Sequence, residues 1–417
     1  MEEDVEMIIV KLENDNYDGT NDNKVNKLVL FDQKTGSIKV KVLAREMDTV
    51  KDYGEINAGI RQCLRDDSVK YKIVNTIPVK GGYSAPFKLY VDITDKCQLN
   101  CKHCLTKYLN NDNEISIEDI KDIAKECKKL VIMQVKLGGG EPTLHPNFYE
   151  ILDAFTEAGC YISMSTNGYS MNEKMAKTLK GHNVKTTVSI EGNEEINDSI
   201  RGKGHFKRAI RALEILQNEG VDVKLRVTLT RAILNEDVIK EIMAFSDTYN
   251  TKVKFSYCRP SGSSIENKLL INYQDYEQYF KVIQLLNSKE YRNKVLLDEG
   301  MMIEQPDSLR SFIYRNKICG AANRSMHINS KLEISPCVFL GNDYKEKEKY
   351  RFGDIEKYWR EEKGENFRRV RKIPIAGVCE SCKRICKNEC TATRLFFKGN
   401  ANCVDPNCIV RRKDDDK

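Results

Sequence analysis

Residues 86–259 alternate strand-like apolar segments with amphipathic helix-like segments, and this alternation constrains the fold more than any other feature. Strands are expected at residues 87–93, 131–137, 161–165, 185–190, 222–228 and 253–257. Helices are expected between them at 117–129, 148–158, 173–179, 206–218 and 236–246. Successive βα units predict a parallel sheet with crossover helices. Six units are too few for a complete eight-stranded barrel, so the sequence predicts an α/β fold built on an open, partial (β/α)6 TIM-like barrel.

The segments on either side of this core differ from it in composition. Residues 1–26 are rich in Asp, Asn and Glu and are expected to form a poorly ordered arm. Two strands around a turn, a short helix and another strand follow, so residues 1–85 are expected to form a small α+β domain. The core is expected at 86–260, a helical bridging segment at 261–318, and an irregular, cysteine-rich domain at 319–417.

Composition narrows the class of protein. The chain has 417 residues, of which 40% are hydrophobic, enough for a sizeable core. No apolar run approaches the roughly 18–20 residues of a membrane-spanning helix, and the acidic N-terminus is unlike a signal peptide, so we expect a cytoplasmic protein without membrane attachment. The balance of 68 basic to 62 acidic residues does not favour a nucleic-acid partner.

The chain contains 15 cysteines, which is unusual for a protein expected in a reducing compartment. Cysteines in that setting are more often metal ligands or catalytic thiols than disulfides. Three lie close together at Cys97, Cys101 and Cys104, and eight lie between residues 319 and 408. The scattered cysteines, Cys63, Cys127, Cys160 and Cys258, are expected to be small buried hydrophobic residues.

The first cysteine group forms a C-x3-C-x2-C run on the loop after the first core strand. Three thiolates can hold three irons of a cubane cluster, which leaves the fourth iron free to bind another ligand. A zinc site is the alternative, although zinc normally takes four ligands and C-x2-C pairs.

Polar and glycine residues follow the next strands. The segment 138–142 reads Gly-Gly-Gly-Glu-Pro, 165–168 reads Ser-Thr-Asn-Gly, and 189–192 reads Ser-Ile-Glu-Gly, with Arg201 shortly after. The chemistry of barrel-type sheets lies at the carboxyl ends of the strands. With His103, the candidate ligand-binding residues at these ends are Gly139, Gly140, Glu141, Ser165, Asn167, Ser189 and Arg201.

This combination of cysteine loop and strand-end motifs resembles the radical S-adenosylmethionine (radical SAM) superfamily. The resemblance implies that the open iron of a [4Fe-4S] cluster chelates S-adenosyl-L-methionine, whose one-electron cleavage gives a 5′-deoxyadenosyl radical. His103 stands where the family has an aromatic residue near the adenine, and the Gly-Gly-Glu-Pro motif receives the methionyl amine. Ser165, Asn167 and Ser189 suit the ribose or carboxylate, and Arg201 the methionyl carboxylate. Glu191 replaces the Asp that the family commonly has.

The second cysteine group comprises Cys319, Cys337, Cys379, Cys382, Cys386, Cys390, Cys403 and Cys408. A zinc ribbon is one interpretation of such spacing. The order resembles the SPASM extension of radical SAM peptide-modifying enzymes, which implies two auxiliary [4Fe-4S] clusters. By family spacing, Cys379, Cys382, Cys386 and Cys408 hold the outer cluster, and Cys319, Cys337 and Cys390 the inner one. Either Cys403 completes the inner cluster or one of its irons is open.

The resemblance implies a peptide or protein substrate. The sulfatase-maturing branch has an Asp after its Pro-Cys pair, whereas this chain has Val338, so formylglycine formation is disfavoured. We expect a maturase of ribosomally made peptides that forms a thioether or a related crosslink in a cysteine-containing precursor with a leader. Its electrons are expected from a flavodoxin- or ferredoxin-type reductant. The alternatives are carbon–carbon crosslinking, oxidation, decarboxylation or epimerisation of a peptide, and a non-catalytic electron-transfer or zinc-scaffold protein. Residues 27–80 are expected to bind the leader by strand addition, or else to cap the barrel.

Overall fold

The computed structural model describes residues 7–13, 24–33, 38–48, 53–64, 70–75, 83–105, 112–298, 301–303, 319–340, 344–346, 348–373, 390–398 and 408. The expected ligands Cys379, Cys382, Cys386 and Cys403 lie outside these residues. In the part of the chain described, no helix is long and apolar enough to cross a membrane.

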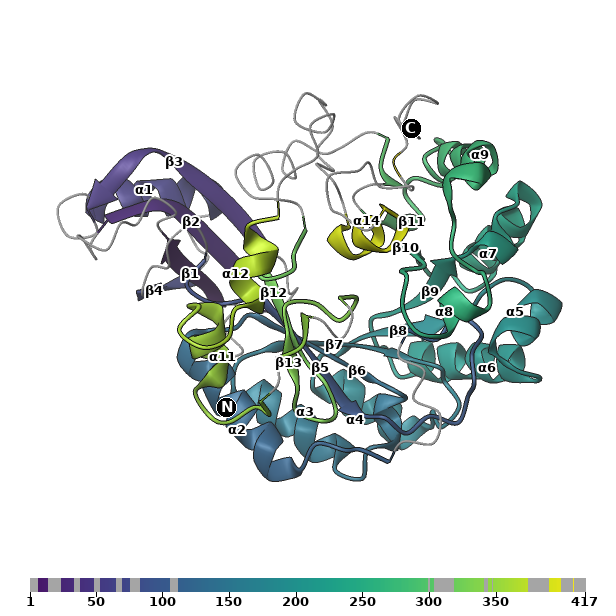
Figure 1. Cartoon of the computed structure of the whole chain (residues 1–417), viewed down its shortest axis with the longest axis horizontal. Coiled ribbons are helices and arrows are strands. Elements are labelled where there is room, and N and C mark those ends of the chain that lie inside the picture. The colour runs from purple at the N-terminus through teal and green to yellow at the C-terminus, as the bar shows by residue number, and fades with distance from the viewer. Residues whose placement is uncertain are drawn as a thin grey trace.

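A nine-stranded sheet forms the centre of the molecule (Figure 1). Its strands are β5 (Lys88–Thr94), β6 (Gln134–Gly139), β7 (Tyr161–Thr166), β8 (Lys185–Ser189), β9 (Val223–Leu229), β10 (Val253–Tyr257), β11 (Val295–Leu297), β12 (Ser325–Ile328) and β13 (Ile334–Ser335). They lie in the order β11-β10-β9-β8-β7-β6-β5-β12-β13, and all neighbours are parallel except β12 and β13. The six expected strands and the open α/β barrel are confirmed. The expected set was incomplete, because β11 to β13 extend the sheet at both edges.

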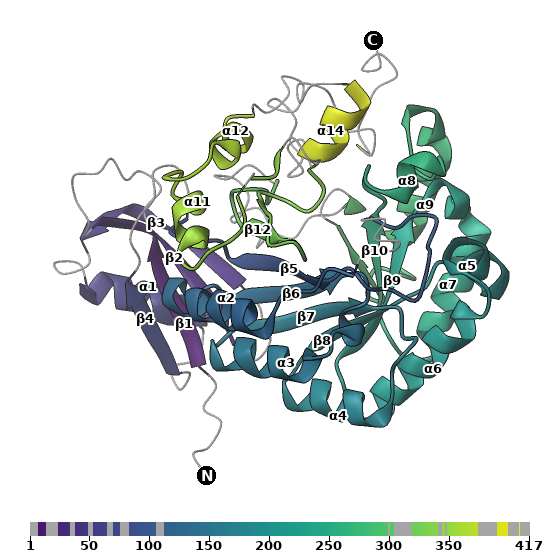
Figure 2. The same cartoon turned by 60° about the horizontal axis from the view of Figure 1, so that its bottom comes forward.

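Helices cover the outer face of the sheet, while α12 and α14 lie on its opposite side and α11 lies next to α2 (Figure 2). The helices that follow the core strands are α2 (Ile117–Leu130), α3 (Phe148–Glu157), α4 (Glu173–Gly181), α5 (Glu194–Arg201), α6 (His205–Asn218), α7 (Glu236–Thr248), α8 (Ser263–Glu266) and α9 (Tyr276–Leu286). Short 3-10 turns are η1 (Pro142–Leu144), η2 (Arg231–Ile233) and η3 (Tyr273–Asp275). The strand expected from residue 131 begins three residues later, because Val131 ends α2 with φ 51°.

The two faces of the core strands differ in chemistry. On β9, Val223, Leu225 and Val227 are buried, whereas the alternate residues Lys224 and Arg226 are only partly buried. Successive strand residues point to opposite faces, so the apolar set packs under the helices and the polar set faces the barrel interior. The space inside the barrel at the carboxyl ends of these strands is therefore lined by polar side chains and is not filled by an apolar core.

The N-terminal unit is a second, four-stranded sheet with one helix. Its elements are β1 (Met7–Glu13), β2 (Lys24–Asp32), β3 (Ile38–Asp48), α1 (Tyr53–Leu64) and β4 (Lys70–Asn75), in the order β3-β2-β1-β4. The expectation of a poorly ordered arm over residues 1–26 was wrong for 7–13. This segment forms β1, which pairs antiparallel with β2 and parallel with β4. The hydrogen bonds to strands on both sides stabilise β1, although the acidic and polar residues around it favour disorder.

Both faces of this second sheet are covered. One face buries Val10, Leu28 and Leu30 with Ile56 and Ile60 of α1. The other face buries Ile9, Val29 and Phe31 together with Tyr83, Phe87 and Met133, which lie just before β5 and β6. The N-terminal sheet therefore caps the amino ends of the first barrel strands, at the end remote from the motif-bearing loops.

The C-terminal segment was expected to be an irregular domain, but its described parts pack directly on the barrel. Besides β12 and β13, its described parts form α11 (Asp354–Trp359), α12 (Asn366–Arg371) and α14 (Thr391–Lys398). Glu126 of α2 is buried and accepts hydrogen bonds from the Tyr350 hydroxyl at 3.0 Å and the Glu356 amide at 2.9 Å. The Trp359 indole donates to the Tyr83 carbonyl at 2.6 Å. The core and the C-terminal segment are thus joined by a buried interface that contains both hydrogen bonds and apolar contacts.

Candidate active site

A cavity of about 530 Å³ lies at the carboxyl ends of the core strands. It is large enough for a cofactor-sized ligand. The candidate residues that line it are His103, Gly139, Gly140, Glu141, Ser165, Asn167, Ser189 and Arg201, with Cys97, Cys101, Cys104, Cys319, Cys337 and Cys390. Two cysteine groups that are far apart in the sequence therefore border one space. Cys408 is described but is not among the lining residues.

The cysteine loop is held by main-chain hydrogen bonds on both sides. The Cys104 amide donates to the Cys101 carbonyl at 3.0 Å, and the Lys102 amide donates to the Ile200 carbonyl at 2.8 Å. The Ser263 amide donates to the Cys104 carbonyl at 2.9 Å. The loop is thus attached to α5 and to the segment after β10, so its thiols are fixed before any ligand arrives.

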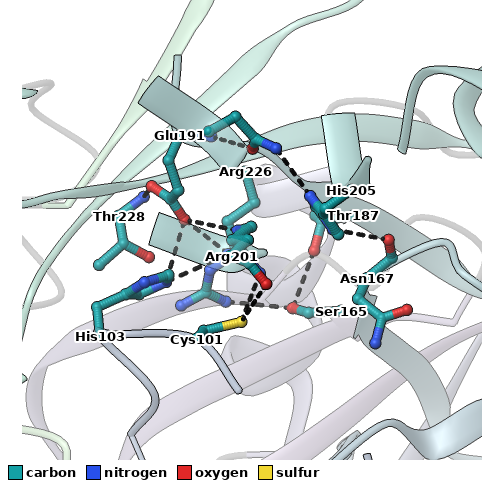
Figure 3. Close-up of polar contacts among 11 residues, drawn as sticks. Cys101, His103, Ser165, Asn167, Thr187, Glu191, Arg201, His205, Arg226 and Thr228 are labelled. Carbon is teal, nitrogen blue, oxygen red and sulfur yellow. Dashed lines mark hydrogen bonds and ion pairs between the residues drawn. The ribbon is translucent and has the colours of Figure 1, made fainter. Parts of the chain in front are cut away.

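A buried charged group lies beside the loop, formed by Glu191, Arg201 and His103 (Figure 3). Glu191 Oε1 accepts from Arg201 Nε at 3.2 Å and Nη2 at 2.6 Å, and lies 3.1 Å from His103 Nε2. Glu191 Oε2 accepts from the Thr228 amide at 2.9 Å. Burial raises the pKa of Glu191, but Arg201 and His103 outweigh that effect, so the net pKa is lowered and the carboxylate is charged.

Arg201 lines the cavity and also has partners within the protein. Two of its guanidinium nitrogens are engaged by Glu191, and Nη1 lies 3.9 Å from Cys101 Sγ. Glu191, which stands where the family commonly has Asp, thus contacts the Nε and Nη2 edge of the guanidinium. Arg201 therefore places positive charge against Cys101, where it opposes the effect of burial, which raises the pKa of that thiol.

Glu141 lines the cavity and is held by hydrogen bonds within the protein. Its buried carboxylate accepts from the Thr143 hydroxyl at 2.8 Å, the Thr166 hydroxyl at 2.8 Å and the Asn167 amide at 2.7 Å. These bonds turn the side chain into the protein, where it joins the ends of β6 and β7. The groups of this motif that remain for a ligand amine are the adjacent main-chain carbonyls, which are good acceptors.

Asn167 connects the end of β7 to the cysteine loop. Its Nδ2 donates to Gln98 Oε1 at 3.2 Å and lies 3.8 Å from Cys97 Sγ. Its carbonyl faces His205 Nε2 at 3.0 Å, and the other ring nitrogen of His205 faces Asn197 at 3.0 Å. Burial lowers the pKa of His205 to about 4, so the ring is neutral and donates from Nε2 to Asn167.

The Gly-Gly-Glu-Pro motif needs its glycines because the main chain of residues 94–96 lies too close to leave room for a Cβ. A Cβ at Gly140 would lie 2.2 Å from the Lys96 carbonyl oxygen and 2.6 Å from that of Asp95. At Gly139, which has φ 114°, it would lie 2.2 Å from the Thr94 oxygen. The Gly140 amide donates to Thr94 and the Glu141 amide to Lys96. The motif thus packs its main chain directly on the start of the cysteine loop.

We expect Gly140→Ala to displace this loop, because the added methyl group meets main-chain oxygens that cannot rotate away. Overpacking of this kind costs about 1–3 kcal/mol, and thermal unfolding together with iron content after reconstitution measures the effect. Gly181→Ala is the matched control, since a Cβ there meets nothing within 4 Å. Equal stability and iron content in the two variants would contradict the prediction.

Ser165 and Ser189 lie on neighbouring strands of the cavity wall. Ser165 Oγ accepts from the Thr187 hydroxyl at 2.9 Å and from Arg226 Nη1 at 3.2 Å (Figure 3). Ser189 is buried and lines the same space. Arg226 therefore reaches from β9 across to β7, inside the barrel.

The second cysteine group is attached to the first strand of the core. Ser335 precedes Cys337 by two residues, and its hydroxyl bonds the Cys337 carbonyl at 3.3 Å. His327 lies 3.1 Å from Ser335 Oγ and 2.9 Å from Asp92 Oδ2, through its two ring nitrogens. A buried chain of hydrogen bonds thus runs from β5 to the segment that carries Cys337.

The donor sets suit iron–sulfur clusters and a bound nucleoside sulfonium. Desolvation by the surrounding protein raises the pKa of Cys97 to about 11 and that of Cys337 to about 12, with further increases from neighbouring thiols. Such grouped, desolvated thiols become thiolates when cationic irons bind them. His103 Nδ1 is buried without a hydrogen-bond partner, which leaves one ring nitrogen for a ligand. Among the described residues, no three His, Cys, Asp or Glu side chains are arranged around a single metal ion.

Comparison with known proteins identifies the family. A family model of the radical SAM superfamily matches residues 91–247, and one of the SPASM iron–sulfur cluster-binding domain matches 319–383. The mycofactocin maturase MftC of Mycolicibacterium smegmatis is 30% identical over 346 residues, which span 79% of this chain and 84% of that protein. The chain belongs to the radical SAM superfamily. Radical SAM proteins carry a [4Fe-4S] cluster and use S-adenosylmethionine, so this chain is an enzyme with those cofactors.

Solved radical SAM structures share the fold. Streptococcus suis SuiB bound to its precursor peptide SuiA superposes with a TM-score of 0.70 at 16% identity, covering 95% of this chain and 97% of that chain. The anSMEcpe structure with bound AdoMet superposes with a TM-score of 0.61 at 17% identity, covering 77% and 93%. At these identities the likeness concerns the fold alone.

Sequence reasoning missed three residues of this radical SAM site. Glu191 was quoted without a role, and His205 and Arg226 were not considered. Glu191 did give a signal, because it stands in a strand-end motif ten residues before its partner Arg201. His205 gave none, because its partner Asn167 lies 38 residues earlier in the chain. Arg226 did give one, since the alternation of Lys224, Arg226 and Thr228 with apolar residues on β9 marks an interior that is polar.

Proposed function

We propose that this radical SAM enzyme is a peptide maturase. The observation that carries the proposal is the shared cavity, which is bordered by Cys97, Cys101 and Cys104 and also by Cys319, Cys337 and Cys390. The first cluster supplies one-electron cleavage of S-adenosylmethionine and hence a radical that abstracts hydrogen. An auxiliary cluster held by the second cysteine group would border the same cavity. Such a cluster can accept an electron from the substrate radical or bind a substrate atom at an iron. A purely electron-carrying protein has no use for a ligand-sized space between its metal sites.

A peptide is the substrate class favoured by the relatives. MftC of Mycolicibacterium smegmatis is named a maturase, and AlbA of Bacillus subtilis, 26% identical over 336 residues, is named a bacteriocin biosynthesis protein. AlbA matches 74% of this chain and 70% of its own length. SuiB has been crystallised with its precursor peptide. The polar side chains in the cavity wall, such as Asn167 and Ser189, also suit a peptide, whose main chain needs hydrogen-bond partners on leaving water.

The N-terminal sheet is proposed to contribute leader binding at an edge. Its outer strands are β3 and β4, each paired with one neighbour only among the described strands. An extended peptide can add to such an edge through main-chain hydrogen bonds. The sheet also packs on the barrel through Ile9, Val29 and Phe31, so capping and leader binding use different parts of the unit. The proposed domain limits remain 1–85, 86–260, 261–318 and 319–417.

The bond we propose is a thioether. The substrate loses two hydrogens: one is transferred as an atom to give 5′-deoxyadenosine, and the other leaves the cysteine thiol as a proton. The sulfur–carbon bond then forms with loss of one electron, for which an oxidised auxiliary iron–sulfur cluster is the acceptor. An open iron near Cys319, Cys337 and Cys390 would hold the substrate thiolate during this step. The physiological reductant is proposed to be a flavodoxin or ferredoxin.

Incubation of the enzyme with candidate short cysteine-containing peptides, taken from genes near its own, tests the proposal. We expect anaerobic incubation with S-adenosylmethionine and dithionite to release 5′-deoxyadenosine and to remove two hydrogens from the peptide. Mass spectrometry after thiol alkylation distinguishes a thioether, which blocks alkylation, from a carbon–carbon crosslink, which does not. Loss of carbon dioxide would indicate decarboxylation, and an unchanged mass with altered chirality would indicate epimerisation. Release of 5′-deoxyadenosine with every such peptide unmodified would refute the maturase assignment.

A further inference from the structure

Crosslinking of the peptide requires a group that takes up a proton. In the reaction proposed above, one substrate hydrogen leaves as an atom and the other as a proton, and a carbon–carbon crosslink has the same balance. A positioned carboxylate can accept such a proton. Among the described residues, the cavity is lined by the carboxylates of Asp92, Glu141 and Asp298.

Two of these carboxylates hold the protein together. Asp92 is buried, and its Oδ2 lies 2.9 Å from Nε2 of His327 on β12. Glu141 is buried and accepts hydrogen bonds from the Thr166 hydroxyl and the Asn167 amide at the end of β7. Use of either side chain as a base would break contacts between strands.

The carboxylate of Asp298 is only partly engaged. Asp298 directly follows β11, whose last residue Leu297 pairs with Phe255 of β10. Its Oδ2 accepts from the Tyr257 amide at 3.3 Å and lies 3.8 Å from Arg259 Nη2, while Oδ1 makes no hydrogen bond with a described residue. The side chain is 25% exposed, against 8% for that of Asp92. Of the three carboxylates, that of Asp298 is therefore the most accessible from the cavity.

Asp298 lies at the end of the barrel that carries the cysteine loop. It follows the last residue of β11, and the loop of Cys97 follows β5, so both lie at the carboxyl ends of strands in the parallel part of the sheet. Burial and the charges of Cys337 and Asp298 raise the pKa of Tyr90 to about 12, which places both of these side chains near the phenol. A base at Asp298 therefore lies within the space that both cysteine groups border.

The lysines of the cavity are the competing bases, and they are placed less favourably. Lys88, Lys136 and Lys254 stand at the first, third and second positions of their strands, toward the amino ends of the barrel. Burial lowers the pKa of Lys88 to about 7 and also lowers the pKa of Lys136, so a neutral amine is accessible to both. A substrate at the level of the cysteines nevertheless meets Asp298 before it reaches these lysines.

We propose that Asp298 is the general base of the crosslinking step. This assignment rests on the proposed maturase function. In the thioether reaction, the carboxylate of Asp298 takes the proton of the substrate thiol, and a hydrogen atom passes from the substrate carbon to the 5′-deoxyadenosyl radical. The sulfur–carbon bond then forms, and the one remaining electron goes to the oxidised auxiliary cluster. The proton on Asp298 is released to solvent before the next turnover.

Asp298→Asn, compared with the wild type on the same cysteine-containing peptide deuterated at its carbon atoms, tests this role. We expect iron content, peptide affinity and deuterium transfer into 5′-deoxyadenosine to stay within about twofold, while crosslink formation falls about 100-fold or more. Asp298→Glu should retain part of the crosslinking, because it keeps a carboxylate. Asp237→Asn is the control and should match the wild type, since the side chain of Asp237 is 85% exposed on α7.

The pH profile separates a base from a structural residue. Without the base, the thiolate must form by ionisation in solution, so crosslinking by Asp298→Asn should rise about tenfold per pH unit up to the ordinary cysteine pKa of about 8.5. The wild type should change little over that range. The charged or titratable groups around Asp298 are Tyr90, Lys136 and Arg259. Lys136→Met should therefore keep the wild-type profile.

Three results would overturn the assignment. Equal crosslinking by Asp298→Asn and the wild type would do so and would leave the maturase function in place. Loss of deuterium transfer together with crosslinking would show a structural role for Asp298. Loss of crosslinking in Lys136→Met, recovered at high pH, would assign the base to the lysine. If the wild type modifies no candidate peptide, the maturase function is refuted, and the assignment of Asp298 falls with it.

Discussion

Glu191→Gln is expected to destabilise the protein by about 3–5 kcal/mol, because it leaves the buried Arg201 guanidinium without its carboxylate. Glu191 is completely buried and also faces His103 at 3.1 Å. Loss of the Glu191 charge leaves Arg201 and His103 without the group that positions them beside Cys101. The rate of S-adenosylmethionine cleavage should therefore fall as well as the free energy of unfolding. Chemical denaturation and the rate of 5′-deoxyadenosine release measure the two effects.

An exposed ion pair supplies the control for this prediction. Arg231 and Asp275 are 2.9 Å apart at the surface, and Asp275→Asn is expected to cost no more than about 1 kcal/mol. The double variant Glu191→Gln with Arg201→Met should recover stability, since it removes both charges, but should not recover cleavage. Similar losses for Glu191→Gln and Asp275→Asn would show that burial of the first pair has no energetic importance.

The charge of Glu191 also gives a pH dependence. Its pKa is lowered in the folded protein, so its contribution to stability is complete above the ordinary glutamate pKa and is lost as pH falls through the lowered value. Acid unfolding of Glu191→Gln should therefore be less steep in that range. The same slope in both proteins would contradict the lowered pKa.

Cys337→Ala is expected to abolish peptide modification while leaving S-adenosylmethionine cleavage measurable. Cys337 is partly buried, and its thiol is near Cys319 and Cys390, as their effect on its pKa shows. Its loss should remove the inner auxiliary cluster, which iron analysis and Mössbauer intensity report, without affecting the loop of Cys97, Cys101 and Cys104. The radical would then form without an acceptor for the substrate electron.

Two cysteine variants complete this experiment. Cys258→Ala is the matched control, since Cys258 is a buried cavity-lining residue with no proposed metal role, and its iron content and activity should be unchanged. Cys403→Ala tests the open iron, because a variant with full iron content and full activity excludes Cys403 as a ligand. Loss of one cluster in Cys403→Ala would reject the open site and the thioether mechanism that depends on it.

The sequence predicted the parts of the molecule that depend on local pattern. Strand and helix periodicity located β5 to β10, and spacing located the three cysteines of the first loop. It did not predict β1, because that strand is stabilised by β2 and β4 and not by its own composition. It also did not predict the direction of Glu141, whose partners Thr166 and Asn167 are on another strand. Sequence motifs thus identified which residues lie at the site. The contacts of each residue could not be predicted, because they are made between different strands.

The pairing of β12 with β5 has a consequence for how this chain can be divided. β12 provides hydrogen bonds along Lys88 to Val91 of β5, on the edge opposite β6. A chain cut before residue 319 would leave that edge open, with main-chain groups available to pair with another molecule. Removal of the auxiliary segment would therefore turn β5 into an exposed, aggregation-prone edge strand, instead of yielding a smaller working enzyme. Its hydrogen bonds make this segment a structural requirement of the barrel as well as a carrier of cysteines.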